Sequence, residues 1–334
     1  MSHRPLLIVI TPVRNEAWVL EAFLTHCSSW ADHIIIADQY STDGSREICA
    51  RFPKVKIIDN PTREWVEYKC RARLLEEASK IEGDKIIFAL DADEFLSEGF
   101  DHTEGWQHIM ESKPNEIFCF NWLNLYDDFC HTYKDVFHAE WAAHFDQSID
   151  IVAEYTAREK NSVHSQRVPC LDKCKYTDID DILFVHLAKL NHRRTQNKMD
   201  FYQVVSIDKN PLKANPVSMY RAYNNYYPYP YKVECLPEPI RLYCPGSQTD
   251  CRNLVQESDN GQHYIDEIVA IIKREGYKKF DKLGIWDNPD LIAAGITHTP
   301  PLRFRILHKY LKFSQQRHNL RPIKVLDKII RNLF

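Results

Sequence analysis

Glycine is scarce in this chain, and long apolar runs are missing from it. Only 9 of the 334 residues are glycine, so glycine-rich loops that cradle phosphate groups have few places to form. No segment approaches the ~18 to 20 apolar residues of a membrane-spanning helix. The opening MSHRPLLIVITPVRNEA contains too short an apolar run for a signal peptide. We therefore expect a globular protein that stays in the cytoplasm, on the side of the membrane where it is made.

Paired cysteine motifs are also missing. The ten cysteines are scattered, and no two CxxC motifs supply the four ligands of a structural zinc site. Reduced cysteines that contribute to packing are the expected state, which agrees with a cytosolic compartment.

Charge is distributed unevenly along the chain. Residues 302–334 contain nine Lys or Arg and one acid, a net charge of +8, which leaves −12 for residues 1–301. The basic residues alternate with Leu, Ile and Phe at near-helical spacing, as in helices that bind anionic membranes. Docking of this tail on the acidic remainder of the chain is an equally open alternative.

Apolar strands alternate with helices over the first hundred residues. Residues 6–11, 33–39, 55–59 and 85–91 are continuous apolar runs, typical of parallel strands covered on both faces. Pro12 is expected to end the first strand. The apolar spacing after it predicts a helix around residues 20–27, and a longer helix is predicted over 65–82. This alternation predicts a doubly wound α/β sheet.

Polar residues follow each predicted strand. They are Thr11 to Glu16, Asp38 to Ser45, Asp59 with Asn60, and Asp91, Asp93 and Glu94. Because ligands of such sheets bind beyond the carboxyl ends of the strands, these groups are expected to converge. Two carboxylates at Asp91 and Asp93 suit Mg²⁺ or Mn²⁺, although solvated surface acids would give the same pattern.

Three motifs resemble family 2 glycosyltransferases of the GT-A fold. They are TPVRNE (11–16), WADHIIIADQYSTDGS (30–45) and FALDADEF (88–95), in the same order and spacing. The similarity includes bacterial sugar transferases of the lipopolysaccharide-core type. The resemblance implies a GT-A-like doubly wound mixed sheet flanked by helices, with an acceptor-side extension and a C-terminal helical tail.

The resemblance also implies roles for individual residues. Thr11, Pro12, Arg14, Glu16 and Asp38 would hold the base and ribose of a nucleotide sugar. Asp91 would lie against the ribose and diphosphate and share the metal with Asp93. Arg71 is retained from a motif of relatives that reads A-R-N-x-G, whereas the Asn and Gly are lost.

The resemblance weakens in the second half of the chain. IFCFNWLNLY (117–126) predicts a further strand on the acceptor side. NSVHS (161–165) and LFVHL (183–187) resemble histidine motifs of the same relatives. They imply that His164 and His186 face the sugar-phosphate site, with His186 as a further metal ligand and Lys198 near the diphosphate.

The catalytic base is not assigned by these motifs, since Ser165 stands where relatives often have Glu. A single displacement with inversion needs a carboxylate that accepts the acceptor's proton. Asp127, Asp128, Asp180 and Asp181 are available. Asp181 is the first choice because it precedes the strand of His186, and His164 is the other candidate.

The sequence therefore predicts a metal-dependent hexosyltransferase with four segments. Residues 1–115 would bind the donor and 116–235 the acceptor, 236–301 would be a helical extension, and 302–334 the basic tail. A UDP-linked donor, a glycan or lipid-linked acceptor and no nucleic acid are expected. A DxD phosphatase and a membrane-associated scaffold with a degenerate nucleotide site remain as alternatives.

Overall fold

The computed structural model divides into two compact units. It describes residues 4–61, 66–133, 138–146, 148–158, 165–169, 174–209, 215–224, 233–246, 249–256 and 259–334. The first unit contains Met1–Leu125, Asp135–Leu187 and Leu236–Glu257, and the second contains Tyr126–Lys134, Ala188–Cys235 and Ser258–Phe334. This division says nothing about the roles assigned to the four sequence segments, which stay predictions.

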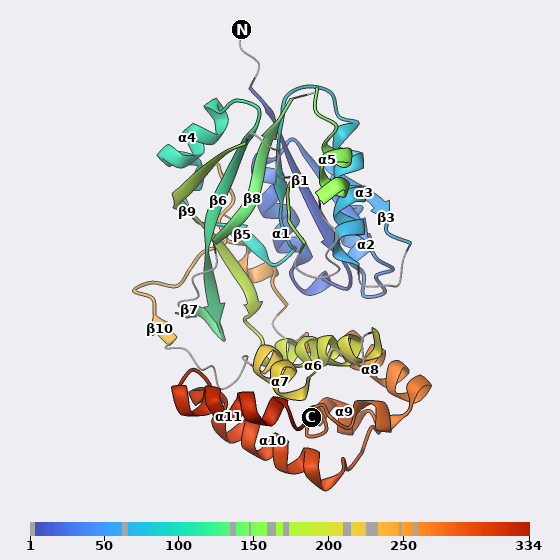
Figure 1. Ribbon diagram of the computed structural model, residues 1–334. Coiled ribbons are helices and arrows are strands. Elements are labelled where there is room, and N and C mark those ends of the chain that lie inside the picture. The colour runs from blue at the N-terminus through green and yellow to red at the C-terminus, as the bar shows by residue number, and fades with distance from the viewer. Residues whose placement is uncertain are drawn as a thin grey trace. The chain divides into compact units, whose positions relative to one another are not determined.

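Four parallel strands form the centre of the first unit (Figure 1). They are β1 (Leu6–Val13), β2 (His33–Asp38), β3 (Val55–Asp59) and β4 (Lys85–Ala89), in the order β4–β1–β2–β3. Val9 pairs with Ile34 of β2 and Phe88 of β4, and all three are fully buried. The continuous apolar runs therefore form a parallel sheet covered on both faces, as the sequence predicts.

Pro12 does not end the first strand, contrary to the expectation. β1 continues to Val13, and Pro12 pairs with Ala37 of β2. The neighbour on the other side, β4, pairs with β1 only as far as Ile10. Beyond that point β1 has one open edge, where a residue without a backbone N–H is tolerated.

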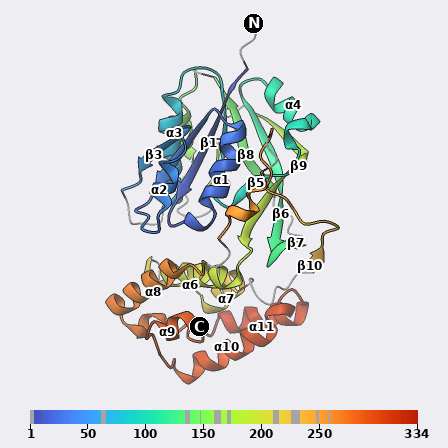
Figure 2. The same cartoon turned by 180° about the vertical axis from the view of Figure 1, so that it is seen from behind.

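Helices cover both faces of this sheet (Figures 1 and 2). On one face, α3 (Glu67–Ser79) and α5 (Ile151–Arg158) pack over alternate residues such as Ile8 and Ile35. On the other face lies α1 (Ala17–Trp30), whose Trp30 ring lies 5.0 Å from that of Phe88. The short α2 (Ser45–Cys49) follows β2 and contacts α1. Two helical layers around one sheet confirm the predicted α/β fold.

Further strands extend the sheet beyond β4 and make it mixed. β8 (His138–Phe145) pairs antiparallel with β4, and β6 (Glu116–Tyr126) pairs antiparallel with β8. The strand predicted over 117–126 is therefore confirmed. β9 (Lys175–Lys189) pairs with β6 and with the short β5 (Glu94–Leu96), which follows β4 directly. Between β5 and β6 lie η1 (Phe100–His102) and α4 (Glu104–Glu111), and η2 (Cys251–Leu254) contacts α1.

The second unit is mainly helical. Its helices are α6 (His192–Lys209), α7 (Pro216–Tyr223), α8 (Gln262–Glu275), η3 (Tyr277–Phe280), α9 (Pro289–Ala293), α10 (Leu302–Ser314), η4 (Gln315–Arg317) and α11 (Arg321–Arg331). A core of apolar side chains from α6 and α8 joins most of them, and β7 (Asp128–Tyr133) pairs antiparallel with β10 (Val233–Cys235). The predicted helical tail is confirmed. Within the described ranges, no helix is both long and apolar enough to cross a membrane.

Candidate functional site

The loops after β1 and β2 are tied together by hydrogen bonds. The backbone N–H of Asn15 donates to Ser41 Oγ (2.9 Å), and the N–H of Thr42 donates to Asn15 Oδ1 (2.8 Å). Asp43 Oδ2 accepts from the N–H of Ala17 at the start of α1 (2.9 Å). Asn15 adopts φ = 55°, a left-handed conformation that asparagine tolerates better than most residues. These contacts fix the loop that carries Arg14 and Glu16.

Three buried polar atoms gather at the carboxyl ends of β1, β2 and β3. Thr11 Oγ1, Asp38 Oδ1 and Asn60 Oδ1 are buried and find no hydrogen-bond partner among the described residues. The other carboxylate oxygen of Asp38 accepts from Arg46 Nη1 (2.8 Å). The same Arg46 nitrogen reaches Asp59 (2.9 Å), which links the ends of β2 and β3. Buried polar atoms are normally paired, so this edge of the sheet is suited to a polar ligand.

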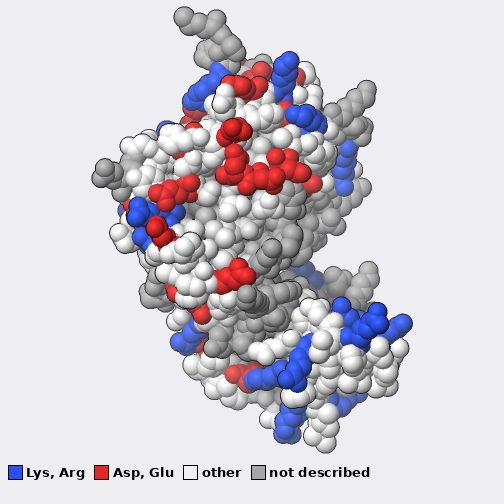
Figure 3. Space-filling view, turned by 90° about the vertical axis from the view of Figure 1, so that its left-hand side faces the viewer, with Lys and Arg blue, Asp and Glu red and all other residues white. Residues whose placement is uncertain are grey.

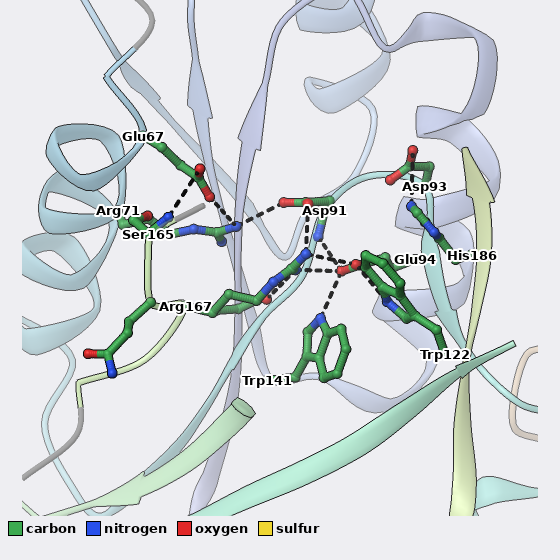
Figure 4. A network of polar contacts seen from close by, with 12 residues as sticks. Glu67, Arg71, Asp91, Asp93, Glu94, Trp122, Trp141, Ser165, Arg167 and His186 are labelled. Atoms are coloured by element: carbon green, nitrogen blue, oxygen red, sulfur yellow. Dashed lines mark hydrogen bonds and ion pairs between the residues drawn. The ribbon is translucent and has the colours of Figure 1, made fainter. Parts of the chain in front are cut away.

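Asp91 lies between two arginines (Figure 4). Its Oδ1 accepts from Arg71 Nη2 and its Oδ2 from Arg167 Nη2, both at 2.9 Å. Arg71 comes from α3 and is fully buried. Its Nε and Nη1 atoms have no partner within the described chain. The geometry therefore holds Asp91 in one orientation and leaves two buried nitrogens of the Arg71 guanidinium able to donate to an anion.

Glu94 is the most enclosed acid of the site. Its carboxylate is fully buried and accepts from Arg167 Nη1 (2.6 Å) and from the indole N–H groups of Trp122 (3.1 Å) and Trp141 (3.2 Å). The backbone N–H of Asp91 also donates to it (2.9 Å). Burial raises the pKa of Glu94 to about 7; Arg167 opposes this shift, and the nearby acids reinforce it. With its oxygens enclosed by these donors, Glu94 supports Arg167 and Asp91.

Asp93 and His186 face each other (Figure 4). His186 Nε2 lies 3.8 Å from Asp93 Oδ2, and both side chains are mostly buried. His186 Nδ1 is 2.8 Å from Asn124 Oδ1, and the imidazole stacks on Trp122 with 4.2 Å between the ring centroids. A proton on Nδ1, donated to Asn124, leaves the lone pair of Nε2 directed toward the Asp93 carboxylate.

Among the remaining predicted residues, Asp181 lies away from this group. Asp181 Oδ2 accepts from the N–H of Gly105 in α4 (2.9 Å). It precedes His186 by five residues in β9, about 16 Å along an extended strand. Lys198 lies in α6 of the second unit, and His164 lies outside the described residues. The roles of these three residues stay predictions.

Sequence reasoning missed the residues that organise the site. Arg167 contacts both Asp91 and Glu94, yet it follows the histidine motif at 161–165 without a recognised pattern of its own. Trp122 and Trp141 gave no functional signal, because they lie in strands, where aromatic residues are common. A lone arginine beside a family-like motif was the only available signal. Among the described residues, no group of three or more His, Cys, Asp or Glu side chains is placed to hold a metal by itself.

Part of the chain, including most residues of this site, matches a known protein family. Residues 8–149 match the model of the family described as Glycosyl transferase family 2. These residues belong to glycosyl transferase family 2. The family 2 domain contains β1 to β4 and with them Thr11, Asp38, Arg71, Asp91 and Asp93. It indicates a nucleotide-sugar-binding enzyme of the glycosyltransferase type. A comparison with curated proteins found no match.

Several solved structures are similar to the chain at low identity. One is glucosyl-3-phosphoglycerate synthase from Mycobacterium tuberculosis in complex with Mn²⁺, UDP and glucosyl-3-phosphoglycerate, at 12% identity, over 55% of this chain and 72% of that chain, with a TM-score of 0.32. Another is 4-diphosphocytidyl-2C-methyl-D-erythritol synthase from Anaerococcus prevotii, at 14% identity, 52% and 89% coverage, and a TM-score of 0.32. HddC from Yersinia pseudotuberculosis has 12% identity, 55% and 93% coverage, and a TM-score of 0.31. TM-scores this low carry no argument about substrate or mechanism.

Proposed function

We propose that this protein is a metal-dependent glycosyltransferase that moves a sugar from a UDP-linked donor to a glycan or lipid-linked acceptor in the cytoplasm. The observation that carries the proposal is the set of unpaired buried polar atoms on Thr11, Asp38 and Asn60, beside the Arg71–Asp91 pair, inside the family 2 domain. The nine described cysteines are free thiols, which supports the cytoplasmic part of the proposal.

The unpaired atoms fit the two ends of a nucleotide diphosphate. Oxygens of Asp38 and Asn60 accept hydrogen bonds, so they suit the ring N–H of uracil and the hydroxyls of ribose. Thr11 can donate or accept. At Arg71, the two unpaired nitrogens suit the oxygens of the diphosphate, because a buried guanidinium binds phosphate oxygens with charge-assisted hydrogen bonds. Each buried group thus gains the partner that it lacks.

Asp93 and His186 fit a divalent cation shared with the diphosphate. The carboxylate and the Nε2 lone pair both point into the 3.8 Å space between them. A mixed oxygen and nitrogen pair suits Mn²⁺ better than Mg²⁺, which prefers oxygen ligands alone. Both oxygens of Asp91 are held by arginines. Asp91 would therefore lie against the ribose and diphosphate and contribute less to the metal than Asp93 does. When bound, the metal would stabilise the negative charge that develops on the leaving diphosphate.

We assign a different role in sugar transfer to each residue around the proposed site. Arg71 would neutralise diphosphate charge from a fixed position, because Asp91 holds its Nη2 group. Arg167 and Glu94 would keep Asp91 oriented without touching the donor. Inversion by single displacement is carried over from the family resemblance, and Asp181 and His164 remain the proposed bases.

Thermal unfolding with UDP and Mn²⁺ tests the metal site. We expect Mn²⁺ to increase the stabilisation by UDP, and Asp93→Ala to remove that increase while the fold survives. Glu98→Ala, which removes an exposed acid five residues after Asp93, serves as the control and should behave like the wild type. An unchanged Mn²⁺-dependent shift in Asp93→Ala would refute the metal assignment.

Measuring the turnover of UDP-sugars distinguishes a glycosyltransferase from a scaffold that only binds nucleotide. We expect slow hydrolysis of a UDP-sugar in the presence of Mn²⁺ even without an acceptor. If UDP binds but a panel of UDP-sugars is never hydrolysed or transferred, the enzymatic proposal fails and a degenerate nucleotide-binding scaffold is the better description.

A further inference from the structure

Residues 302–334 present only positive charge to solvent. All nine of their Lys and Arg side chains are exposed. The single acid, Asp327, is buried and accepts hydrogen bonds from Arg221 (2.9 and 3.0 Å) and from the Tyr310 hydroxyl (2.8 Å). Its negative charge is therefore already compensated inside the second unit. On the face of this unit drawn in Figure 3, Lys and Arg groups lie mostly among uncharged surface, with an acidic group beside some of them.

The same residues expose an unusual amount of apolar surface. Nine of the thirteen large apolar side chains that are exposed in the described chain belong to residues 302–334, a tenth of the sequence. Phe313 is 75% exposed, Leu333 74% and Val325 60%. Scattered exposed apolar residues need no explanation, but a cluster of this kind marks an interaction surface.

On helix α11, the exposed basic residues and the exposed apolar residues form two parallel stripes. Val325 and Ile329 of α11, followed by Leu333 just beyond its end, recur at intervals of four residues and form an exposed apolar stripe with Leu326. Arg321, Lys324, Lys328 and Arg331 recur at intervals of three or four residues and form a basic stripe. Asp327 anchors the remaining face to the unit through Arg221. The apolar face of α11 is thus turned largely to solvent.

We propose that α10 and α11 bind an anionic lipid surface. A bilayer with anionic headgroups offers negative charge to the basic stripe and an apolar boundary to the apolar stripe, so it satisfies both at once. A second copy of this chain is a poorer occupant, because a symmetric contact would bring nine cations against nine cations. Docking on an acidic surface of the same chain would pair the charges without burying the apolar stripe. The inference does not depend on the transfer reaction.

Vesicle flotation of the full chain tests this proposal. We expect binding to vesicles of phosphatidylcholine mixed with phosphatidylglycerol, little binding to phosphatidylcholine alone, and weaker binding at high salt. Lys324→Gln/Lys328→Gln should weaken binding by roughly thirtyfold. Lys273→Gln/Lys278→Gln is the matched control, because it removes two exposed cations elsewhere in the second unit and should bind like the wild type. Ile329→Ser/Leu333→Ser should also weaken binding.

Other outcomes would overturn it. Equal loss of binding in the two lysine pairs would mean that only the overall charge matters. Absence of vesicle binding, with a dimer that Ile329→Ser/Leu333→Ser dissociates in light scattering, would assign the surface to a second copy. Absence of both would leave intramolecular docking. Asp93→Ala should bind vesicles like the wild type, so failure of the catalytic proposal is distinguishable from failure of this one.

Discussion

At the scale of single residues, the site depends on how buried charges are paired. Arg167 contacts Asp91 and Glu94, packs with its guanidinium carbon 5.1 Å from the centre of the Trp141 ring, and donates to the carbonyl of Ala89 (3.1 Å). It therefore connects the end of β4 with the start of β5. A buried charge without its partner is costly, so this arginine is a structural requirement of the site.

Arg167→Met should destabilise the first unit strongly. Removal of the guanidinium leaves the carboxylate of Glu94 buried next to the acids of the DxD motif, and we expect a loss of about 3–5 kcal/mol in unfolding free energy. Urea unfolding followed by tryptophan fluorescence measures it. The double variant Arg167→Met/Glu94→Gln should lose less, because the buried negative charge is removed as well.

Arg51→Met is the control for this comparison. Arg51 pairs with Glu21 at the surface, where an ion pair contributes less than about 1 kcal/mol. If Arg167→Met costs no more than Arg51→Met, or if the double variant is as unstable as the sum of its single changes, the charge-pairing account is wrong.

At the scale of elements, a buried ion pair anchors α11. Arg221 of α7 donates to Asp327 and also to Ser314 Oγ (2.6 Å) and Gln315 Oε1 (2.8 Å). It thereby joins α7, the end of α10 and α11. This pair determines which face of α11 is turned toward the unit and which is left exposed.

Asp327→Ala should release α11 without unfolding the rest of the second unit. The loss of the counter-ion leaves the buried Arg221 uncompensated, a local cost of about 3–5 kcal/mol. Hydrogen exchange of residues 321–331 should become faster, whereas exchange in α8 should not change. Asp287→Ala removes an exposed partner of Lys312 and is the control. Unchanged exchange in α11 would contradict the anchoring role.

At the scale of the whole molecule, the two units have separate cores, and we propose a different task for each. Apart from Lys198, whose contact with the diphosphate is a prediction from the sequence, the residues proposed to bind donor and metal lie in the first unit, and the basic amphipathic surface lies in the second. Each task can therefore be measured in the full chain while the other is monitored.

UDP with Mn²⁺ should stabilise the first unit only. A ligand at about a hundred times its Kd adds about 2.7 kcal/mol to the state that binds it. We expect slower hydrogen exchange for the most protected amides of β1, β2 and β4, with no change in α8. Equal protection of α8 would show that the ligand contacts or orders both units.

The sequence predicts the sheet well and the site partly. Continuous apolar runs located β1 to β4 because a strand buried on both faces needs no polar residue. The predicted end of β1 at Pro12 was wrong. Proline can continue the strand because β4 pairs with β1 only as far as Ile10, and the sequence does not show where that pairing stops. Asp91 and Asp93 stood out through their spacing, whereas Arg167 and the two tryptophans come from segments distant in sequence.

The sequence by itself determined the order of strands and helices, the family-like motifs and the charge of the tail, because these are local patterns of residue type. Tertiary structure decided which charges are paired. It placed Arg167 against Asp91 and Glu94, directed His186 toward Asp93, and buried Asp327, so that every exposed charged side chain of residues 302–334 is a Lys or Arg. Such pairing depends on distances of a few ångströms between residues far apart in the chain, and only the folded sheet and helices set those distances.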